Sequence, residues 1–451
     1  MKPAIKEGQP TGDSANTSVA IVGAGACGLV AALKLHHLGV DCIVIERDAM
    51  PQGSTALSSG FIPAPCTAAQ LRQGIVDSVT AFEKDIQAKA KNTAAKHLVT
   101  AYAKAIGPAM NFLEEQHCMQ WQVLDSFLYP GHSQYRMHTL AEKTGEGLMR
   151  HLTNAAHAAG ITVLCNARTT SLWRNEGSIT GITFTRPDGS EEHLKCDFLL
   201  LACNGFGGNT GMVKQYIPEI ANAQFGGHTG NDGSAITWGQ ELDVALADMN
   251  AYQGHGSWAT PHGTLISWAL MMEGGIQVNS EGKRFHDETQ GYSEAATHVL
   301  AQPGGIAWNV FDEKLYELGR TFPVFCDAEK AGAIRKFKSL EELADAIGCP
   351  TQALQTSCTQ PNFSRNVSAP FYAIKVTGAL FHTQGGLKID EHCRVIKNDT
   401  KIIANLLAAG GAAGGVSGNA VWGYLSGNGL LSAVAGGYIA ALTAHQYLKE
   451  V

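Results

Sequence analysis

A βαβ unit over residues 18–48 constrains the fold of this chain more than any other segment. The apolar residues 19–22 predict a buried parallel strand, which runs into the pattern G-x-G-x-x-G formed by Gly23, Gly25 and Gly28. The first glycine permits a tight turn, the second lets a pyrophosphate approach the backbone, and the third lets the next helix pack closely on the sheet. We therefore expect phosphate groups at the N-terminus of that helix.

The remaining parts of the unit follow in order. Residues 29–38 predict the helix, Gly39 ends it, and residues 40–45 predict a second apolar strand. Glu46 directly follows this strand, about where an acceptor for a ribose hydroxyl is expected. Because strand, turn, helix, strand and acid occur together, the unit predicts a bound dinucleotide.

Composition limits the class of partner. The chain has 451 residues, 45% of them apolar and 16% charged, which is enough for two domains or for one large domain with an insertion. The net charge is −7 and no basic stretch stands out, so we expect a small-molecule substrate and no nucleic-acid partner. No apolar run reaches the roughly 18 residues of a membrane helix, so we expect no membrane span.

The start of the chain and its cysteines bear on its compartment. Residues 1–17 are polar and lack the apolar core of a secretory signal, so we expect a flexible N-terminal tail there. The 11 cysteines are scattered without a C-x-x-C pair, which argues against a disulfide framework, a zinc site and an iron–sulfur cluster. A reducing, cytoplasmic setting is the simplest expectation.

Two later strands also run into glycine-rich turns. Residues 198–202 lead into the turn 203–209, and residues 403–409 lead into the turn 410–415. Residues 426–429 then open the last helix. Turns of this kind commonly meet at the carboxyl ends of a parallel sheet, so we expect all of them to converge on one ligand.

Several motifs, taken in order, resemble a known family. They are GAGACG with Glu46, ACNGFGGN at 202–209, GGIQVNSEGKRF at 274–285, HTQGG at 382–386, and AAGGAAGGVSG followed by SGNGL. The chain resembles the flavoproteins of the fumarate reductase and succinate dehydrogenase type, which include the 3-ketosteroid dehydrogenases. The resemblance implies an α/β fold with a Rossmann-like, glutathione-reductase-type FAD-binding domain over 18–256 and 377–451. It also implies an inserted α+β capping domain over 257–376.

The resemblance implies FAD as the cofactor and assigns its contacts residue by residue. Gly410 and the start of the last helix resemble the place where a helix N-terminus stabilises negative charge on the flavin. The full set of expected cofactor-binding residues is Gly23, Gly25, Gly28, Glu46, Arg47, Ser54, Thr55, Ser58, Ser59, Gly60, Ala167, Ala202, Asn204, Gly205, Gly410, Ser426, Gly427, Asn428, Leu430 and Leu431.

Two positions depart from the family's flavin pattern. The family's glutamate after Gly410 is Gly411 in this chain. Ser54 stands where the covalently flavinylated members carry histidine, so we expect FAD to be bound non-covalently.

Further departures concern the substrate. Fumarate and succinate enzymes use arginine to hold carboxylates and to deliver a proton, because its guanidinium group stays positively charged and presents its N–H donors in a fixed geometry. In this chain the proton-delivering arginine aligns with Tyr292, and the acid and arginine that feed it align with Trp268 and Met271. The carboxylate-clamping arginine aligns with about Val421. A C4 dicarboxylate is therefore a poor substrate candidate.

Neutral side chains remain as the candidate catalytic set: Tyr292, Tyr424, His382, His255 and Tyr129. In the 3-ketosteroid dehydrogenases one tyrosine removes a proton and another hydrogen-bonds the ketone. Tyr424 resembles that carbonyl-binding tyrosine and Tyr129 the assisting one. We therefore predict an FAD-dependent oxidoreductase acting on CH–CH groups, by α,β-desaturation of a carbonyl compound, expected to be cyclic, or by the reverse ene reduction. A separate electron acceptor or donor is expected.

Other interpretations of these residues stay open. Tyr292 could pack the cap against the flavin domain, and Tyr424 could be a structural hydrogen-bond donor. A second enzyme hypothesis is fumarate-reductase-like reduction of an unsaturated carboxylic acid, recognised by Arg136, His255 and His382, with Arg136 and His138 equally able to line a loop. A third is a flavin-binding subunit without turnover.

Overall fold

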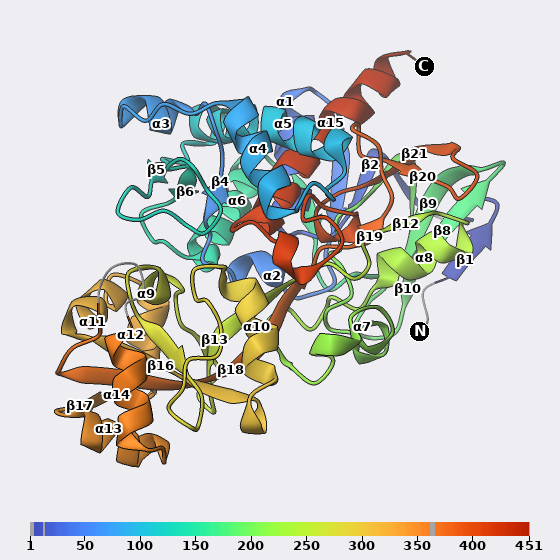
Figure 1. Cartoon of the computed structure of the whole chain (residues 1–451). Helices are drawn as coiled ribbons and strands as arrows, with labels where there is room; N and C mark the ends of the chain where they lie inside the picture. The colour runs from blue at the N-terminus through green and yellow to red at the C-terminus, as the bar shows by residue number, and fades with distance from the viewer. Residues whose placement is uncertain (1–3, 12–13, 361–365, 451) are drawn as a thin grey trace.

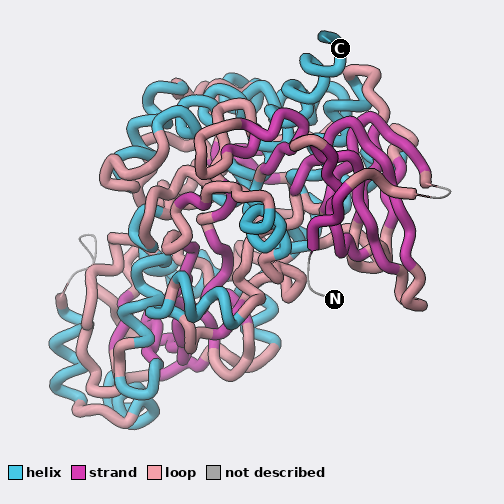
Figure 2. Tube along the Cα trace, turned by 90° about the vertical axis from the view of Figure 1, so that its right-hand side faces the viewer, coloured by secondary structure: helices cyan, strands magenta, loops and turns pink. Residues whose placement is uncertain are grey.

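The structure, a computed structural model, describes residues 4–11, 14–360 and 366–450. Two lobes are seen in Figures 1 and 2: a large lobe around a sheet of nine described strands and a smaller lobe around a sheet of seven. The combination of a parallel sheet with covering helices confirms the predicted α/β class. None of the described helices has both the length and the apolarity needed to cross a membrane.

Five parallel strands form the centre of the large lobe. Their order across the sheet is β7–β3–β2–β10–β21. The residues paired at their carboxyl ends are Leu164, Ile45, Val22, Leu201 and Ala408. All five strands therefore end at one edge of the sheet, and the turns that follow them meet there. The strands are β2 (Ala15–Val22), β3 (Cys42–Ile45), β7 (Thr162–Leu164), β10 (Glu191–Leu201) and β21 (Ile402–Ala408).

Helices α1 (Ala26–His37) and α15 (Asn428–Glu450) pack together beside this sheet. A Cβ at Gly28 would lie 1.9 Å from the carbonyl oxygen of Gly23, and one at Gly437 would lie 2.3 Å from that of Cys27. Both positions therefore require glycine for close packing. This accounts for the third glycine of the G-x-G-x-x-G pattern in the way the sequence predicts.

The sheet continues through β9 (Ser178–Thr185) and β8 (Arg168–Asn175), which pair antiparallel, and ends with β1 (Ala4–Glu7), which is parallel to β8. Strand β1 pairs with β8, with Ala4 opposite Ser171, and β2 already begins at Ala15. The expectation of a flexible tail over 1–17 is thus wrong for these described residues, because their backbone groups pair in the sheet.

Shorter elements surround the sheet of the large lobe. They are α2 (Gly53–Ala56), β4 (Ile62–Pro63), α3 (Ala68–Arg72), α4 (Val79–Lys89), α5 (Lys96–His117), β5 (Gln122–Val123), β6 (Met137–Thr139), α6 (Gly145–Ala158), α7 (Thr210–Tyr216), η1 (Pro218–Ile220), α8 (Ser234–Glu241), β12 (Leu246–Ala247), β19 (Gly386–Leu387), β20 (Arg394–Ile396), η3 (Gly410–Ala412) and η4 (Val421–Gly423). In Figure 1, β5 and β6 lie between α3, at the top of this lobe, and the small lobe's helix α9.

The small lobe is a sheet with helices packed on it. The long strand β18 pairs with β11, β13, β16 and β17. The expected limits of the capping domain, 257 and 376, fall inside β13 and β18, two strands of this sheet. The limits themselves stay a prediction. The elements are β11 (Gln224–Phe225), β13 (Tyr252–Ala259), β14 (Thr264–Leu265), α9 (Ala269–Met272), β15 (Ile276–Val278), α10 (Tyr292–Leu300), η2 (Pro303–Gly305), β16 (Ile306–Asp312), α11 (Glu313–Gly319), α12 (Pro323–Lys330), β17 (Arg335–Phe337), α13 (Leu340–Ile347), α14 (Thr351–Thr359) and β18 (Phe371–Thr383).

Arg136 is part of the core of the large lobe. Its side chain is fully buried; Nε and Nη2 donate to the two oxygens of Asp77 at 2.9 and 2.8 Å, and Nη1 donates to Asp85. The guanidinium also lies over the ring of Phe82, 4.8 Å from its centroid. His138, in β6, bonds Thr67 and a backbone carbonyl. The proposed role of Arg136 in binding a substrate carboxylate is therefore wrong, because its donors are used by two aspartates.

The Arg136→Met variant tests this structural role. Removing one partner of a buried ion pair leaves uncompensated charge and costs about 3–5 kcal/mol. We expect the free energy of unfolding, measured by urea titration, to fall by about that amount. The matched control is Arg150→Met, which removes a largely exposed pair with Glu142 and should cost less than about 1 kcal/mol. Equal losses in the two variants would contradict the role of Arg136.

Candidate active site

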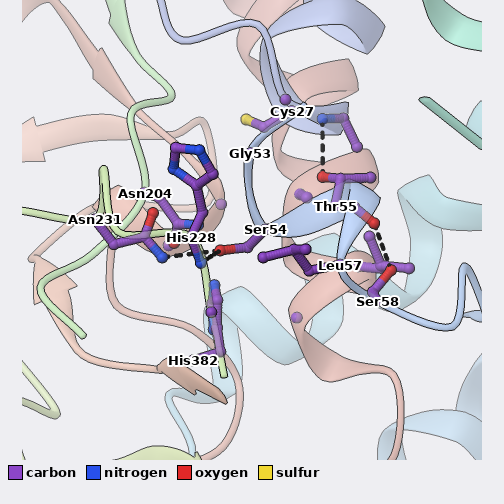
Figure 3. A pocket seen from close by; sticks show the side chains of 18 of the residues that line it. Cys27, Gly53, Ser54, Thr55, Leu57, Ser58, Asn204, His228, Asn231 and His382 are labelled. Atoms are coloured by element: carbon purple, nitrogen blue, oxygen red, sulfur yellow. Dashed lines mark hydrogen bonds between the residues drawn. The ribbon is translucent and has the colours of Figure 1, made fainter. Parts of the chain in front are cut away.

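A cleft with about 1790 Å³ of space, open to solvent, follows the edge where the parallel strands end. Residues after β2, β3, β10 and β21 line one end, and residues of the small lobe line the other. Figure 3 shows part of it, with Cys27 and the α2 segment on one side and Asn204, Asn231 and His382 on the other.

The first end has the features that a dinucleotide requires. Gly23 has a left-handed φ of +107°, and a Cβ there would lie 2.5 Å from the carbonyl oxygen of Ala202. Gly25 is the N-cap of α1 and contributes no side chain, so the backbone at the helix N-terminus stays accessible. Glu46 is 6% exposed and accepts from the N–H of Ala24 at 2.8 Å and from that of Asp48 at 2.9 Å. Each carboxylate oxygen keeps a lone pair for a hydroxyl donor.

Two buried polar atoms on the cleft wall also fit FAD. The hydroxyl of Thr169 and the indole N–H of Trp238 line the cleft, and neither has a hydrogen-bond partner among the described residues. Buried polar atoms are nearly always hydrogen-bonded, so these two indicate a polar ligand. The residues at this end of the cleft therefore fit FAD.

The segment around α2 borders the middle of the cleft. Ser54 accepts from the backbone N–H of His228 at 3.3 Å and from the side-chain amide of Asn231 at 2.8 Å (Figure 3). Thr55 accepts from the N–H of Ala26 at 3.2 Å, and the hydroxyl of Ser58 donates to the carbonyl of Thr55 at 2.7 Å. These bonds tie α2 to α1 and to the loop 226–234. Non-covalent attachment of FAD stays a prediction.

Three glycines position Tyr292, the first residue of α10. A Cβ at Gly254 would lie 2.7 Å from Cβ of Ala296, one at Gly256 would lie 2.5 Å from Cβ of Ala295, and one at Gly378 would lie 2.4 Å from a backbone oxygen of α10. Helix α10 therefore lies directly on β13 and β18. This packing brings the start of the helix to the cleft.

His255, Tyr292 and Tyr424 form one contact group at this end. The His255 ring stacks on Tyr292 with centroids 4.7 Å apart, and the Tyr292 ring meets Tyr424 edge-on at 6.1 Å. The Tyr424 hydroxyl accepts from the N–H of Gly429, at the start of α15, at 3.4 Å. The backbone N–H of Ser257 donates to Nδ1 of His255 at 3.1 Å, so a neutral His255 carries its proton on Nε2.

Desolvation sets the protonation states of this group. It raises the pKa of Tyr292 well above its usual value; the nearby Tyr424 adds to the rise, and a hydrogen bond with Ser426 opposes it. Desolvation also raises the pKa of Tyr424 to about 12 and lowers the pKa of His255 to about 3. At neutral pH both tyrosines are therefore phenols and His255 is an uncharged imidazole.

Tyr129 lies in an aromatic cluster beside the same group. Its ring is 4.8 Å from that of Phe127 and 6.3 Å from that of Phe61. Desolvation raises the pKa of Tyr129 above its usual value. These aromatic rings make the small-lobe end of the cleft largely apolar.

The structure brings together most of the residues that the sequence singles out. All five candidate catalytic residues line the cleft. The expected cofactor-binding residues that line it are Gly23, Gly25, Glu46, Arg47, Ser54, Thr55, Ser58, Ser59, Gly60, Ala167, Ala202, Asn204, Gly410, Ser426, Gly427 and Leu430.

Four expected cofactor-binding residues do not line the cleft. Gly28 packs against Gly23, and a Cβ at Gly205 would lie 2.0 Å from the hydroxyl of Thr383. Asn428 is fully buried and donates to Ser417, and Leu431 is fully buried in the core. These positions support the walls of the cleft from behind.

Sequence reasoning missed other lining residues. The loop 226–234, GGHTGNDGS, borders the cleft, and its glycines were a signal that could have been read. Trp238, Thr169 and Phe381 carried no local signal, because only the packing of their elements turns them toward the cleft. The missed residues include Cys27, Asp48, Leu57, Phe61, Met137, Arg168, Thr169, His228, Asn231, Asp232, Trp238, Gln253, Leu265, Ser267 and Phe381.

A dinucleotide cleft of this kind, on a Rossmann-like lobe and closed at one end by a second lobe, defines an FAD-dependent oxidoreductase. Comparison with known proteins agrees. The chain belongs to the FAD binding domain family, which matches residues 18–430. This confirms both the flavoprotein family and FAD as the cofactor.

Two curated relatives and one solved structure illustrate the similarity. Probable fumarate reductase Ifc3 of Shewanella frigidimarina is 26% identical over 467 residues, spanning 99% of this chain and 78% of that protein. Urocanate reductase of Eggerthella lenta is 26% identical over 433 residues, spanning 90% and 71%. The 3-ketosteroid-Δ4-(5α)-dehydrogenase of Rhodococcus jostii RHA1 superposes with a TM-score of 0.78 at 22% identity, covering 99% of this chain and 100% of that one. An enzyme of the CH–CH class, as predicted, is confirmed, and the interpretation as a subunit without turnover has no support.

The departure at Gly411 has a steric reason. A Cβ at this position would lie 2.1 Å from Oδ1 of Asn204 and 2.8 Å from Nε2 of His382. Both side chains line the cleft and occupy the space that a longer residue would need. A side chain at position 411 would therefore require Asn204 and His382 to move.

The Gly411→Ala variant tests the crowding. Overpacking of this kind costs about 1–3 kcal/mol, so FAD affinity, measured by fluorescence titration of the apoenzyme, should weaken by roughly tenfold or more. The matched control is Gly415→Ala on the same turn, where the nearest atoms to the new Cβ lie at 3.4 Å, an ordinary contact. Unchanged affinity in Gly411→Ala would contradict the steric account.

Proposed function

We propose that this enzyme interconverts a C=C bond and a CH–CH bond next to the carbonyl group of an uncharged, cyclic ketone or enone. The observation that carries the proposal is the absence of a charged side chain among the described residues at the small-lobe end of the cleft. The residues there are aromatic, aliphatic or neutral polar: Phe61, Tyr129, Met137, Gln253, His255, Leu265, Ser267, Trp268, Tyr292, Phe381, His382 and Tyr424.

The cations of the cleft wall support this choice by their position. Among the described lining residues, the arginines are Arg47 and Arg168, and both pair with Asp232 at 3.2 Å. They flank the Glu46 and Ala167 segments, at the dinucleotide end. A substrate carboxylate at the other end would meet no permanent positive charge, and burying it there would be costly. A ketone oxygen needs only hydrogen-bond donors.

The phenols and imidazoles provide such donors. In the proposed arrangement the Tyr424 hydroxyl donates to the carbonyl oxygen, which makes the adjacent C–H more acidic. The Tyr292 hydroxyl exchanges a proton with the substrate carbon: it gives one in reduction and, as phenolate, takes one in desaturation. Bound FAD supplies the donor or acceptor of hydride. The stacked His255 holds the Tyr292 ring in place, and the aromatic cluster around Tyr129 keeps water away.

A second candidate is reduction of an unsaturated carboxylic acid. The names of the fumarate and urocanate reductases among the relatives favour it. In this chain it would have to rely on His255 and His382, since Arg136 is committed to Asp77 and Asp85. In either case we propose a separate redox partner that exchanges electrons with the flavin.

Anaerobic mixing of the holoenzyme with a panel of saturated cyclic ketones, and of the reduced holoenzyme with enones and unsaturated acids, tests the proposal. Flavin absorbance is followed in each case. We expect bleaching by at least one ketone or reoxidation by at least one enone. Reoxidation by unsaturated acids alone would overturn the proposal in favour of the second candidate.

The Tyr292→Phe variant should retain FAD but lose turnover. Removing a proton-transfer group costs about 10²-fold or more. The FAD content is measured from the ratio of flavin to protein absorbance, and turnover with the best member of the panel. Tyr438→Phe is the matched control, because that ring packs on Phe112 away from the cleft. Equal turnover in Tyr292→Phe and wild type would exclude the proposed proton transfer.

The raised tyrosine pKa predicts opposite pH profiles for the two directions. In reduction the active form is the phenol, which is fully present below its pKa, so the rate should not change between about pH 6 and 9. In desaturation the active form is the phenolate, whose fraction rises about tenfold per pH unit below its pKa. Stopped-flow measurement of each half-reaction would show this difference. A desaturation rate that falls with rising pH would contradict a tyrosine base.

A further inference from the structure

His382 is held from behind by a chain of buried side chains that no step above uses. It lies at the end of β18, opposite Gln253 of β13, and its ring faces the cleft (Figure 3). The side-chain amide nitrogen of Gln384 lies 2.6 Å from its Nδ1. The other ring nitrogen, Nε2, lies toward Asn204 and Gly411, on the cleft wall.

The chain continues away from the cleft. The hydroxyl of Ser417 donates to Oε1 of Gln384 at 2.8 Å, and the side-chain amide of Asn428 donates to the Ser417 oxygen at 3.0 Å. Gln384, Ser417 and Asn428 are 3%, 1% and 0% exposed. The backbone of Gln384 is fixed as well, because its N–H donates to Ala251 at 2.8 Å and its carbonyl accepts from Gly415 at 2.9 Å. Water has almost no access to any of these bonds.

Each bond in this chain has a direction. Ser417 has one hydroxyl proton, and it accepts from Asn428, so its proton goes to Oε1 of Gln384. That oxygen then fixes the opposite end of the amide, the NH₂ group, toward His382. An NH₂ group can only donate, so Nδ1 of His382 must present its lone pair. A neutral imidazole with a lone pair on Nδ1 carries its proton on Nε2.

We propose that Gln384 is a positioning residue that keeps His382 as the Nε2–H tautomer, so that the histidine presents a neutral N–H donor to an acceptor oxygen in the cleft. The identity of that oxygen, a substrate carbonyl, rests on the proposed function; the tautomer does not. A Cβ at Gly429 would lie 3.5 Å from the Tyr424 hydroxyl and 3.9 Å from Nδ1 of His382, so Tyr424 lies near the Nδ1 edge of the ring, while Nε2 lies on the side of Asn204 and Gly411.

The charge state of His382 agrees with this role. Desolvation lowers its pKa to about 4, so the ring is neutral at neutral pH. A donor fixed before the substrate arrives needs no reorganisation when negative charge develops on the carbonyl oxygen, and one such donor is worth about 10²- to 10³-fold in rate. His382 then acts by hydrogen bonding and not as a base.

The tautomer can be read directly in the oxidised holoenzyme labelled with ¹⁵N-histidine. Two-bond ¹H–¹⁵N correlation spectra distinguish a protonated from an unprotonated ring nitrogen, and His382→Gln assigns the signals. We expect an unprotonated Nδ1 and a protonated Nε2. In Gln384→Glu the carboxylate can only accept, so Nδ1 should become protonated. Gln240→Glu, the same change at an exposed position, should leave the His382 signals unaltered.

Gln384→Met provides a second variant that buries no charge. It removes the amide at similar volume, so His382 should become a mixture of tautomers while FAD content is retained. If any substrate of the panel turns over, kcat should fall about 10²-fold in Gln384→Glu, with FAD content unchanged. A protonated Nδ1 in the wild-type enzyme would overturn the proposal, and so would an unchanged tautomer in both Gln384 variants. Because these spectra need no turnover, failure of the proposed substrate class would leave this test intact.

Discussion

The register of the parallel strands is the constraint on which the site depends. Val22 pairs with both Ile45 and Leu201, and Leu201 pairs with Ala408, so segments nearly 400 residues apart end at the same edge. Parallel strands with an even hydrogen-bond spacing must end together if their turns are to face the same ligand. The glycine turns, Glu46 and the start of α15 occupy one cleft for that reason. A register shift of one residue would turn every buried side chain of a strand to the opposite face.

Desolvation is the second constraint, and it acts at the other end of the cleft. Burial at this end removes Tyr292, Tyr424, His255 and His382 from water, so each of them is neutral at neutral pH. In the proposed function, neutral donors suit a carbonyl oxygen, whereas a carboxylate would require a cation. The same packing that places these groups therefore also sets the protonation states on which the proposed function rests.

Sequence reasoning predicted the parts of the molecule that depend on local pattern. The strand-turn-helix around Gly23 and the acid at Glu46 lie where their spacing indicated, because a glycine turn and a parallel strand have few alternative geometries. It was wrong about Arg136 as a carboxylate-binding residue in the second hypothesis, and about a flexible tail at Ala4–Glu7. An arginine can bind a substrate carboxylate, and only the fold shows that Asp77 and Asp85 use the donors of Arg136. A polar segment looks like a tail, and only strand β8 shows that Ala4–Glu7 has a partner.

The sequence by itself determined the dinucleotide unit, the flavin family and the residue types of the candidate site. The tertiary structure decided how those residues act. Three glycines on two strands fix the position of Tyr292. Thr169 and Trp238 have polar atoms without partners on the cleft wall. Hydrogen bonds through Gln384 and Ser417 link His382 to Asn428. The physical reason is that hydrogen-bond direction and desolvation arise from contacts between distant segments, and no local spacing encodes them.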